Sequence, residues 1–219
     1  MTNARRIAAS ALGMYAGLLG AGHGVFETLQ GSGRPDGLAF NAIGPPCQPQ
    51  TVWHACLPAM TVVPSFLVTG ILAVVLGLGI IVWSARCVQR RRGGLVLIML
   101  SIALLLVGGG FVAPFIGIVA GAAGATIGAP LSWWRTRVPG PTLRLLSALW
   151  PWTLVILLFW FPGAWIAGRL VAPAMLRLSG LLFFVFDLGL PFLTPLTALA
   201  HDARSLGPSQ SSQQSTTPR

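Results

Sequence analysis

The chain has 219 residues, of which 54% are hydrophobic and only 8% are charged, and its mean hydropathy is +0.78. Soluble domains carry roughly 25% charged residues, so this composition excludes an ordinary soluble domain and indicates a polytopic membrane protein. The net charge of +10 comes from arginine alone, and the arginines fall in small clusters between apolar segments. This distribution argues against a nucleic-acid-binding surface and for a role in membrane topology.

The first predicted membrane helix covers residues 7–30 and follows Arg5 and Arg6. Its length suits an uncleaved helix better than a signal peptide, and the two arginines place its start in the cytoplasm. Four glycines recur along it with small-xxx-small spacing, namely Gly13, Gly17, Gly20 and Gly24. Such faces let helices approach closely, so we expect this helix to pack centrally and to offer contacts to other membrane subunits.

Residues 31–57 are rich in glycine and proline, which predicts an irregular exoplasmic loop without regular structure. The second predicted span covers residues 60–84. Four arginines follow it within seven positions, at Arg86, Arg90, Arg91 and Arg92. This is the strongest charge cluster in the chain, and it places the loop after the second span in the cytoplasm.

Residues 94–130 are nearly uncharged, and as one helix they would rise about 55 Å against a hydrocarbon core of about 30 Å. The segment must therefore break, and three glycines with a proline at 108–114 are the expected place. This predicts two short spans at about 94–109 and 113–130. A re-entrant hairpin would give the same external topology, and one broken helix is a third alternative.

The last two predicted spans cover residues 145–167 and 179–200, and the polar end 205–219 has the composition of a disordered tail. With six spans and both termini cytoplasmic, only Arg34, Arg169 and Arg177 of the 14 arginines lie outside. Five spans would divide them eight against six, a much weaker positive-inside bias. We therefore predict an all-α bundle of about six transmembrane helices in one domain, residues 1–204.

His23 and Glu27 are four residues apart, so they share one face of the first predicted span. Ionisable groups at membrane depth are costly, which makes them candidates for function. The pair can supply two metal ligands, a proton relay, or an acid and a base. Alternatively, Glu27 lies near the water interface and His23 only bonds a neighbouring helix.

Cys47 and Cys56 enclose eight residues of the predicted exoplasmic loop, where thiols oxidise, so a structural disulfide is expected. His54 lies between them. A metal site of His23, Glu27 and His54 beneath this loop is the alternative, although the cysteine and histidine spacing matches no established zinc pattern. Cys87, in the predicted cytoplasmic loop, is expected to be inert.

Asp187 lies near the middle of the last predicted span and is the most costly residue of the chain at that depth. Gly189, Pro191 and Pro195 follow it, so we expect the helix to kink or unwind just past Asp187. A broken helix beside a carboxylate is how several transporters hold a proton or a cation. The alternative is a kinked packing helix whose acid caps freed amides or pairs with an arginine.

The sequence contains no phosphate-binding glycine loop and no H-E-x-x-H zinc motif, and we expect no cofactor. These patterns favour a non-enzymatic protein, either a small carrier in which Asp187, Glu27 and His23 handle a coupling ion or proton, or an accessory subunit of a membrane complex. A membrane enzyme with an exoplasmic site is the alternative. The absence of lysine with abundant alanine, glycine and proline is typical of a GC-rich genome, which predicts a bacterial plasma (inner) membrane.

Overall fold

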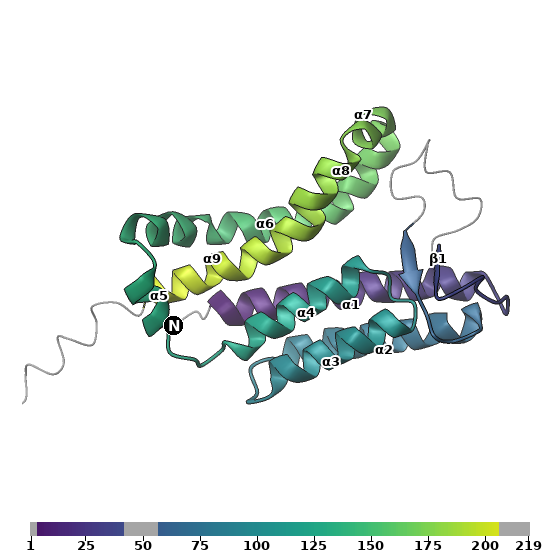
Figure 1. Ribbon diagram of the computed structural model, residues 1–219, viewed down its shortest axis with the longest axis horizontal. Helices are drawn as coiled ribbons and strands as arrows, with labels where there is room; N and C mark the ends of the chain where they lie inside the picture. The colour runs from purple at the N-terminus through teal and green to yellow at the C-terminus, as the bar shows by residue number, and fades with distance from the viewer. Residues whose placement is uncertain (1–3, 42–56, 206–219) are drawn as a thin grey trace, which may run out of the picture.

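The computed structural model describes residues 4–41 and 57–205, and Figure 1 shows that most of its helices run along one long axis. The helical content agrees with the predicted all-α class. In chain order the elements are α1 (Ala4–Leu29), β1 (Ala39–Asn41), β2 (Pro58–Met60), α2 (Phe66–Arg86), α3 (Gly93–Leu106), α4 (Val112–Ala125), α5 (Ser132–Arg137), α6 (Gly140–Leu170), α7 (Ala172–Arg177), α8 (Ser179–Leu182), the π-helix η1 (Phe183–Gly189) and α9 (Leu190–Ser205).

Three helical segments are long and apolar enough to cross a membrane, namely α2, α6 and the continuous segment Ser179–Ser205. This supports the prediction of a membrane protein. α1 is also long, with 26 residues, but it is not among the three. α3 and α4 have 14 residues each. Each therefore rises only about 21 Å, less than the hydrocarbon core. The six spans and the cytoplasmic termini stay predictions.

Backbone-to-backbone contact between glycines holds α1 against α2. A Cβ added at Gly24 would lie 2.5 Å from the carbonyl oxygen of Gly70, and one added at Gly77 would lie 2.6 Å from that of Gly17. Real Cβ atoms do not approach this closely, so both positions require glycine at this helix separation. The two contacts lie seven residues apart on each helix, which makes a straight glycine-lined interface.

The other two glycines of the predicted small-residue face are covered as well. Gly13 meets Ser84 of α2, and Gly20 meets Leu104 of α3. The face predicted for contacts with further subunits is therefore covered by helices of the same chain. Contact with other subunits stays a prediction, but it would use a different surface.

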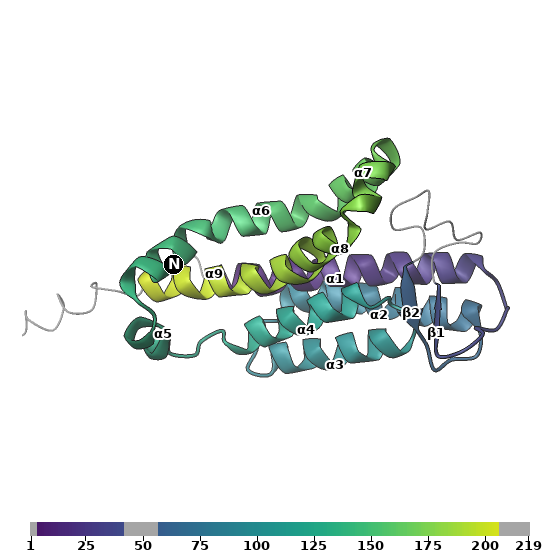
Figure 2. The same cartoon turned by 45° about the horizontal axis from the view of Figure 1, so that its top comes forward.

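The predicted break of the 94–130 segment lies between the end of α3 at Leu106 and the start of α4 at Val112. Gly108 and Gly110 have φ values of +89° and +76°, in the left-handed region that favours glycine. α4 then returns along α3 and also packs on α1. The hairpin of α3 and α4 completes a first group of four helices, which lie side by side in Figures 1 and 2.

The predicted loop 31–57 is not irregular throughout, because β1 pairs with β2 as an antiparallel hairpin. β2 also contacts the α3–α4 turn: the Gly108 N–H donates to the Met60 carbonyl at 2.8 Å, and the Val62 N–H donates to the Leu106 carbonyl at 3.0 Å. The last carbonyls of a helix have no partner within the helix, and the chain entering α2 supplies donors for them. The expectation of a wholly irregular loop was therefore wrong.

α6 and the segment from α8 to α9 form a second, long hairpin with α7 at its far tip (Figure 1). α9 packs on α1 and α4 near the end where α1 begins. Figures 1 and 2 both show α7 far from α1, at the other end of the hairpin. The second hairpin is thus anchored to the first four helices mainly at one end.

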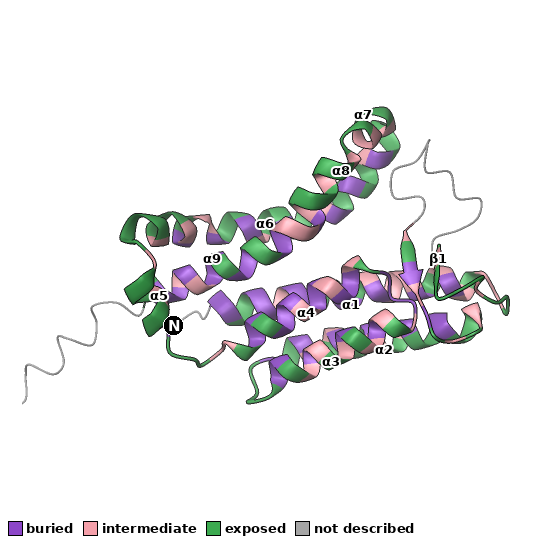
Figure 3. Cartoon of the chain, in the orientation of Figure 1, coloured by how far each residue is buried: buried purple, intermediate pink, exposed green. Residues whose placement is uncertain are grey.

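Large apolar side chains are exposed along the outer faces of the helices. Val75 of α2 is 61% exposed and Phe159 of α6 is 72% exposed. Figure 3 shows exposed positions recurring along α2, α3 and α6. Contiguous apolar surface of this extent marks contact with a membrane or a partner, and it is consistent with lipid around the bundle.

Candidate functional site

Glu27 lies near the end of α1 and is fully buried. Neither of its carboxylate oxygens accepts a hydrogen bond from any residue in the described part of the chain. Both oxygens lie against Gly108, where an added Cβ would collide with them. A buried carboxylate without donors is costly as an anion, and a bound proton or cation relieves that cost.

His23 packs on the same turn as Glu27. A Cβ added at Gly110 would lie 2.7 Å from both Cε1 and Nε2 of the imidazole ring. The two side chains predicted to share a face of α1 therefore both meet the turn between α3 and α4. The glycines serve two purposes here, because they permit the left-handed backbone and leave room for the ring and the carboxylate.

Two buried threonines support this turn, and neither was predicted from the sequence. The hydroxyl oxygens of Thr61 and Thr69 lie 2.6 Å apart, and the Thr69 hydroxyl donates to the Val107 carbonyl at 2.8 Å. Thr69 belongs to the first turn of α2, so the start of α2 is tied to the end of α3. These hydrogen bonds fix the backbone of the turn against which Glu27 packs.

Asp187 is fully buried within the π-helix η1, and its Oδ1 accepts a hydrogen bond from the Trp160 indole N–H at 2.6 Å. The Trp160 ring stacks on Phe186 with centroids 4.1 Å apart. Asp187 thus belongs to the last helical segment and bonds a side chain of α6, with the rings of Trp160 and Phe186 beside it. Its predicted role as an ion or proton carrier stays a prediction.

Of the two expected outcomes, a kink or unwinding, the helix does not unwind: it widens around Asp187 into η1 and continues through Pro191 and Pro195. A proline inside a helix donates no N–H and crowds the carbonyl four residues earlier, which for Pro191 is the carbonyl of Asp187. A wider π turn accommodates this crowding without breaking the helix. Single π turns inside helices frequently occur at functional sites.

Tyr15 of α1 is a candidate that sequence reasoning missed. It is buried, its ring packs edge-on against Phe161 with centroids 5.3 Å apart, and it interacts electrostatically with Asp187. The hydroxyl approaches the Phe161 backbone, but it makes no hydrogen bond within the described residues. Tyr15 is the sole tyrosine of the sequence and lies eight residues before His23, and these two facts were the available signals.

Buried hydroxyls line the contact between α6 and α9. The Thr153 and Thr197 hydroxyl oxygens lie 2.9 Å apart, and the Thr194 hydroxyl donates to the Leu190 carbonyl at 2.9 Å. His201 lies further along the same face of α9, with Nδ1 3.4 Å from the Ser147 carbonyl oxygen. Asp187, Thr194 and His201 are seven residues apart in turn, so they lie on one face of the last helix. We call the buried hydroxyls of Thr153, Thr194 and Thr197 the hydroxyl seam.

The structure does not bring Asp187 and Glu27 together. Asp187 bonds Trp160 and Tyr15 packs on the adjacent Phe161, so Asp187 lies near the level of Tyr15, and Glu27 is twelve residues further along α1. Twelve residues of α-helix rise about 18 Å. The two acids are therefore separate sites at different depths, which α1 passes in succession.

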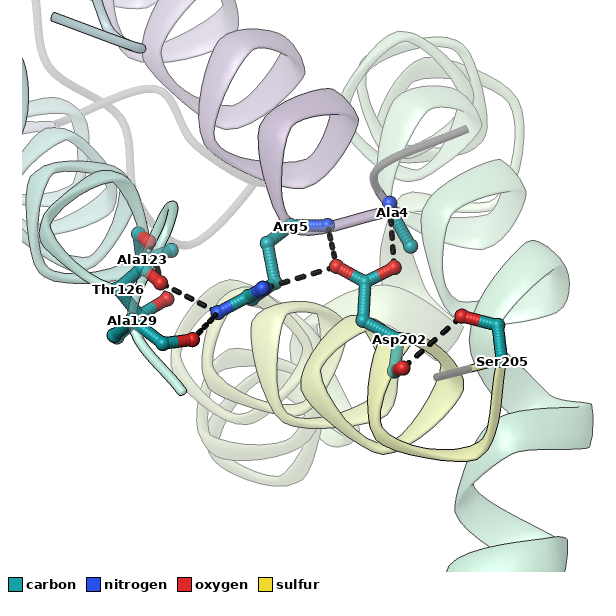
Figure 4. Close-up of polar contacts among 7 residues, drawn as sticks. All are labelled: Ala4, Arg5, Ala123, Thr126, Ala129, Asp202 and Ser205. Atoms are coloured by element: carbon teal, nitrogen blue, oxygen red, sulfur yellow. Dashed lines mark hydrogen bonds and ion pairs between the residues drawn. The ribbon is translucent and has the colours of Figure 1, made fainter. Parts of the chain in front are cut away.

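A third buried acid, Asp202, joins distant parts of the chain at the end where α1 begins (Figure 4). Its carboxylate accepts hydrogen bonds from the backbone N–H groups of Ala4 and Arg5, at 2.9 and 3.2 Å, and pairs with the Arg5 Nε at 2.9 Å. The Arg5 guanidinium also donates to the carbonyls of Thr126 and Ala129. Arg5 was interpreted from the sequence as a topology signal only, and Asp202 was not considered.

His54, Cys47 and Cys56 lie outside the described residues, so the predicted disulfide and the alternative metal site with His23 and Glu27 stay predictions. Within residues 4–41 and 57–205, no group of three His, Cys, Asp or Glu side chains is placed to hold a metal ion. In that part of the chain Cys87 is a free thiol.

Comparison of the chain with protein-family models, with curated proteins and with solved structures found no match. The geometry of the buried acids is therefore the basis for a functional hypothesis.

Proposed function

We propose that this protein is a small multi-pass membrane carrier, in a bacterial plasma membrane, whose buried acids Glu27 and Asp187 take up and release a proton. The observation that carries this proposal is the Glu27 carboxylate, which is fully buried and accepts no hydrogen bond within the described chain. A carboxylate that only packed the fold would be expected to have donors, because an unsatisfied buried polar group is costly. Ionisable groups retained at such cost commonly mark ion or proton pathways.

Asp187 supports the same function from the middle of the bundle. It lies in a π-helix, accepts one hydrogen bond from Trp160, and adjoins the hydroxyl seam. Hydroxyl groups both donate and accept hydrogen bonds, so a row of them provides proton access to a buried acid. Access would run from the end of the molecule where His201 and Asp202 lie, which we predict to be cytoplasmic.

The accessory-subunit version of the hypothesis has less support, since the glycine face expected to bind other subunits is covered by α2 and α3. The enzyme version depends on His54, which lies outside the described residues. A proton carrier is therefore the function that the described side chains support best.

Proton movement by the purified protein in vesicles tests the proposal. Vesicles loaded with a pH-sensitive dye are given an inside-negative potassium diffusion potential, and acidification of the lumen is followed. We expect faster acidification than in empty vesicles, and we expect Glu27→Gln and Asp187→Asn each to abolish the increase. Glutamine and asparagine keep the shape of the acids but do not exchange a proton.

Asp36→Asn is the matched control, because Asp36 is an exposed acid in the segment after α1. This variant should acidify vesicles at the wild-type rate. Wild-type vesicles that behave like empty ones would refute the proposal, and so would full activity in both neutralised variants. Gel filtration and circular dichroism of each variant establish that it is folded before its transport is compared.

A further inference from the structure

We propose that protons pass between the two separate acids along α1, through Tyr15 and His23, with Leu19 as an apolar barrier between them. This inference rests on the proposed function, and it adds the route that connects the two sites. Its basis is the spacing of residues 15, 19, 23 and 27, which follow one another at four-residue intervals on one helix.

Four-residue steps on an α-helix advance about 6 Å along the axis and turn about 40° around it. Side chains at these positions therefore stack in a slowly winding row. Three members of the row are polar, and each has a defined place: Tyr15 packs on Phe161, next to the Trp160 that bonds Asp187, and His23 and Glu27 lie on the glycines of the α3–α4 turn. The row begins at one buried acid and ends with the other.

Leu19 is the one apolar member of the row. It is partly buried and packs against the main hydrophobic core. Tyr15 and His23 are eight residues apart, a rise of about 12 Å, which is too far for a direct hydrogen bond. Proton transfer between them requires a water molecule beside Leu19, so the size of this side chain controls the route.

Each transfer along the row conserves protons. Asp187 gives its carboxyl proton through a water molecule to the Tyr15 hydroxyl oxygen, since the Tyr15 hydroxyl makes no hydrogen bond within the described residues, and Tyr15 releases its own hydroxyl proton to a second water molecule, beside Leu19. This second water passes a proton to one nitrogen of His23, and the other ring nitrogen gives a proton through a third water molecule to the Glu27 carboxylate, whose oxygens accept no hydrogen bond within the described residues. The net change converts the Asp187 acid to carboxylate and the Glu27 carboxylate to acid, and the reverse sequence restores both.

Two pairs of variants in the vesicle assay test the route. Tyr15→Phe removes the hydroxyl and keeps the ring on Phe161, and we expect it to lose the acidification above empty vesicles. Its control is Ser101→Ala, which removes a buried hydroxyl that donates within α3 to the Leu97 carbonyl. This control should acidify vesicles like the wild type.

Leu19→Ala opens the barrier to water, and we expect faster acidification than in the wild type. Its control is Leu18→Ala, the neighbouring leucine of α1, which is 60% exposed and should leave the rate unchanged. Because the leucine pair removes no polar group, its outcome does not depend on whether Tyr15→Phe folds.

The results separate the route from the proposed function. Wild-type vesicles that acidify no faster than empty ones would refute both the route and the proposed function. An active wild type that loses activity in Glu27→Gln and Asp187→Asn, but keeps it in Tyr15→Phe, would refute the route alone. The same conclusion would follow if Leu18→Ala and Leu19→Ala changed the rate equally.

Discussion

Gly108 is the residue on which the Glu27 site depends most directly. Its φ of +89° lies in the left-handed region, and the carboxylate of Glu27 occupies the space that a side chain would need. Any other residue would therefore meet two separate penalties, one from the backbone conformation and one from the collision. Gly128 allows the two penalties to be measured separately. It has a φ of +82°, but a Cβ added there would meet nothing within 4 Å, so alanine at this position carries the backbone penalty without the collision.

Gly128→Ala should lower the free energy of unfolding by roughly 1 to 2 kcal/mol, the cost of left-handed backbone for an L-residue. Gly108→Ala should cost this amount and about 1 to 3 kcal/mol more for overpacking against Glu27. In a Glu27→Ala background the additional cost should disappear, since the colliding oxygens are gone. Chemical denaturation in detergent measures the free energy of unfolding of each variant. The wild type, Gly108→Ala, Glu27→Ala and the double variant form a double-mutant cycle, and Gly128→Ala is the reference for the backbone penalty.

Equal costs for Gly108→Ala and Gly128→Ala in the wild-type background would contradict this account. That result would mean that the carboxylate does not occupy the space beside Gly108. A cost of Gly108→Ala that persisted in the Glu27→Ala background would point to a different neighbour.

At the level of elements, α1 carries both the proposed proton groups and a close, glycine-lined contact with α2. Gly24 and Gly17 allow α2 to touch its backbone, so α1 is held in one rotational position. That position determines which residues of α1 face the α3–α4 turn and which face Asp187. The glycine interface therefore orients the whole row from Tyr15 to Glu27.

Alanine at Gly24 and at Gly22 should have opposite effects. A Cβ at Gly24 would lie 2.5 Å from the Gly70 carbonyl oxygen, whereas a Cβ at Gly22 would meet nothing within 4 Å. Alanine is more favourable than glycine in a helix by about 1 kcal/mol, so Gly22→Ala should raise the thermal unfolding temperature or leave it unchanged. Gly24→Ala should lower it, because the helices must separate. Destabilisation by both variants to the same degree would contradict the interface.

Helix positions could be predicted because their signals are local. The glycines and proline at 108–114 interrupt an apolar segment too long for one span, and α3 and α4 end and begin there. The π-helix was not predicted, since Pro191 explains crowding at Asp187 but does not decide between a break and a wider turn. The β1–β2 hairpin was not predicted either, because its partner is a turn some fifty residues further along the chain.

The residues of the candidate site also fall into two groups, those that local spacing predicts and those that it does not. His23 and Glu27 could be paired from their spacing on one helix, since periodicity is sufficient for that inference. Tyr15 beside Asp187 and Arg5 beside Asp202 could not be predicted, because these contacts join residues 172 and 197 positions apart. Only the arrangement of the two hairpins brings them together.

For the whole molecule, the distribution of the four acids is informative. Asp36 is exposed, whereas Glu27, Asp187 and Asp202 are buried at three levels of the bundle. Asp202 differs from the other two because it is paired and accepts two backbone hydrogen bonds at the start of α1. It therefore acts as an N-terminal cap supplied by a distant helix, and it connects the second hairpin to the first four helices.

Loss of the Asp202 carboxylate should destabilise the molecule more than loss of the exposed Asp36 carboxylate does. Asp202→Asn leaves Arg5 charged and unpaired in a site where both side chains are 6% exposed. Breaking such a buried pair costs about 3 to 5 kcal/mol, so unfolding in detergent should occur at a clearly lower temperature than in Asp36→Asn. Arg5→Leu with Asp202→Leu removes the unpaired charge, but it loses the capping bonds, about 0.5 to 2 kcal/mol, and also the hydrogen bonds from Arg5 to the carbonyls of Thr126 and Ala129. A double variant more stable than Asp202→Asn would show that the unpaired charge is the larger cost, and the opposite order would show that these hydrogen bonds, not charge pairing, connect the second hairpin to the first four helices.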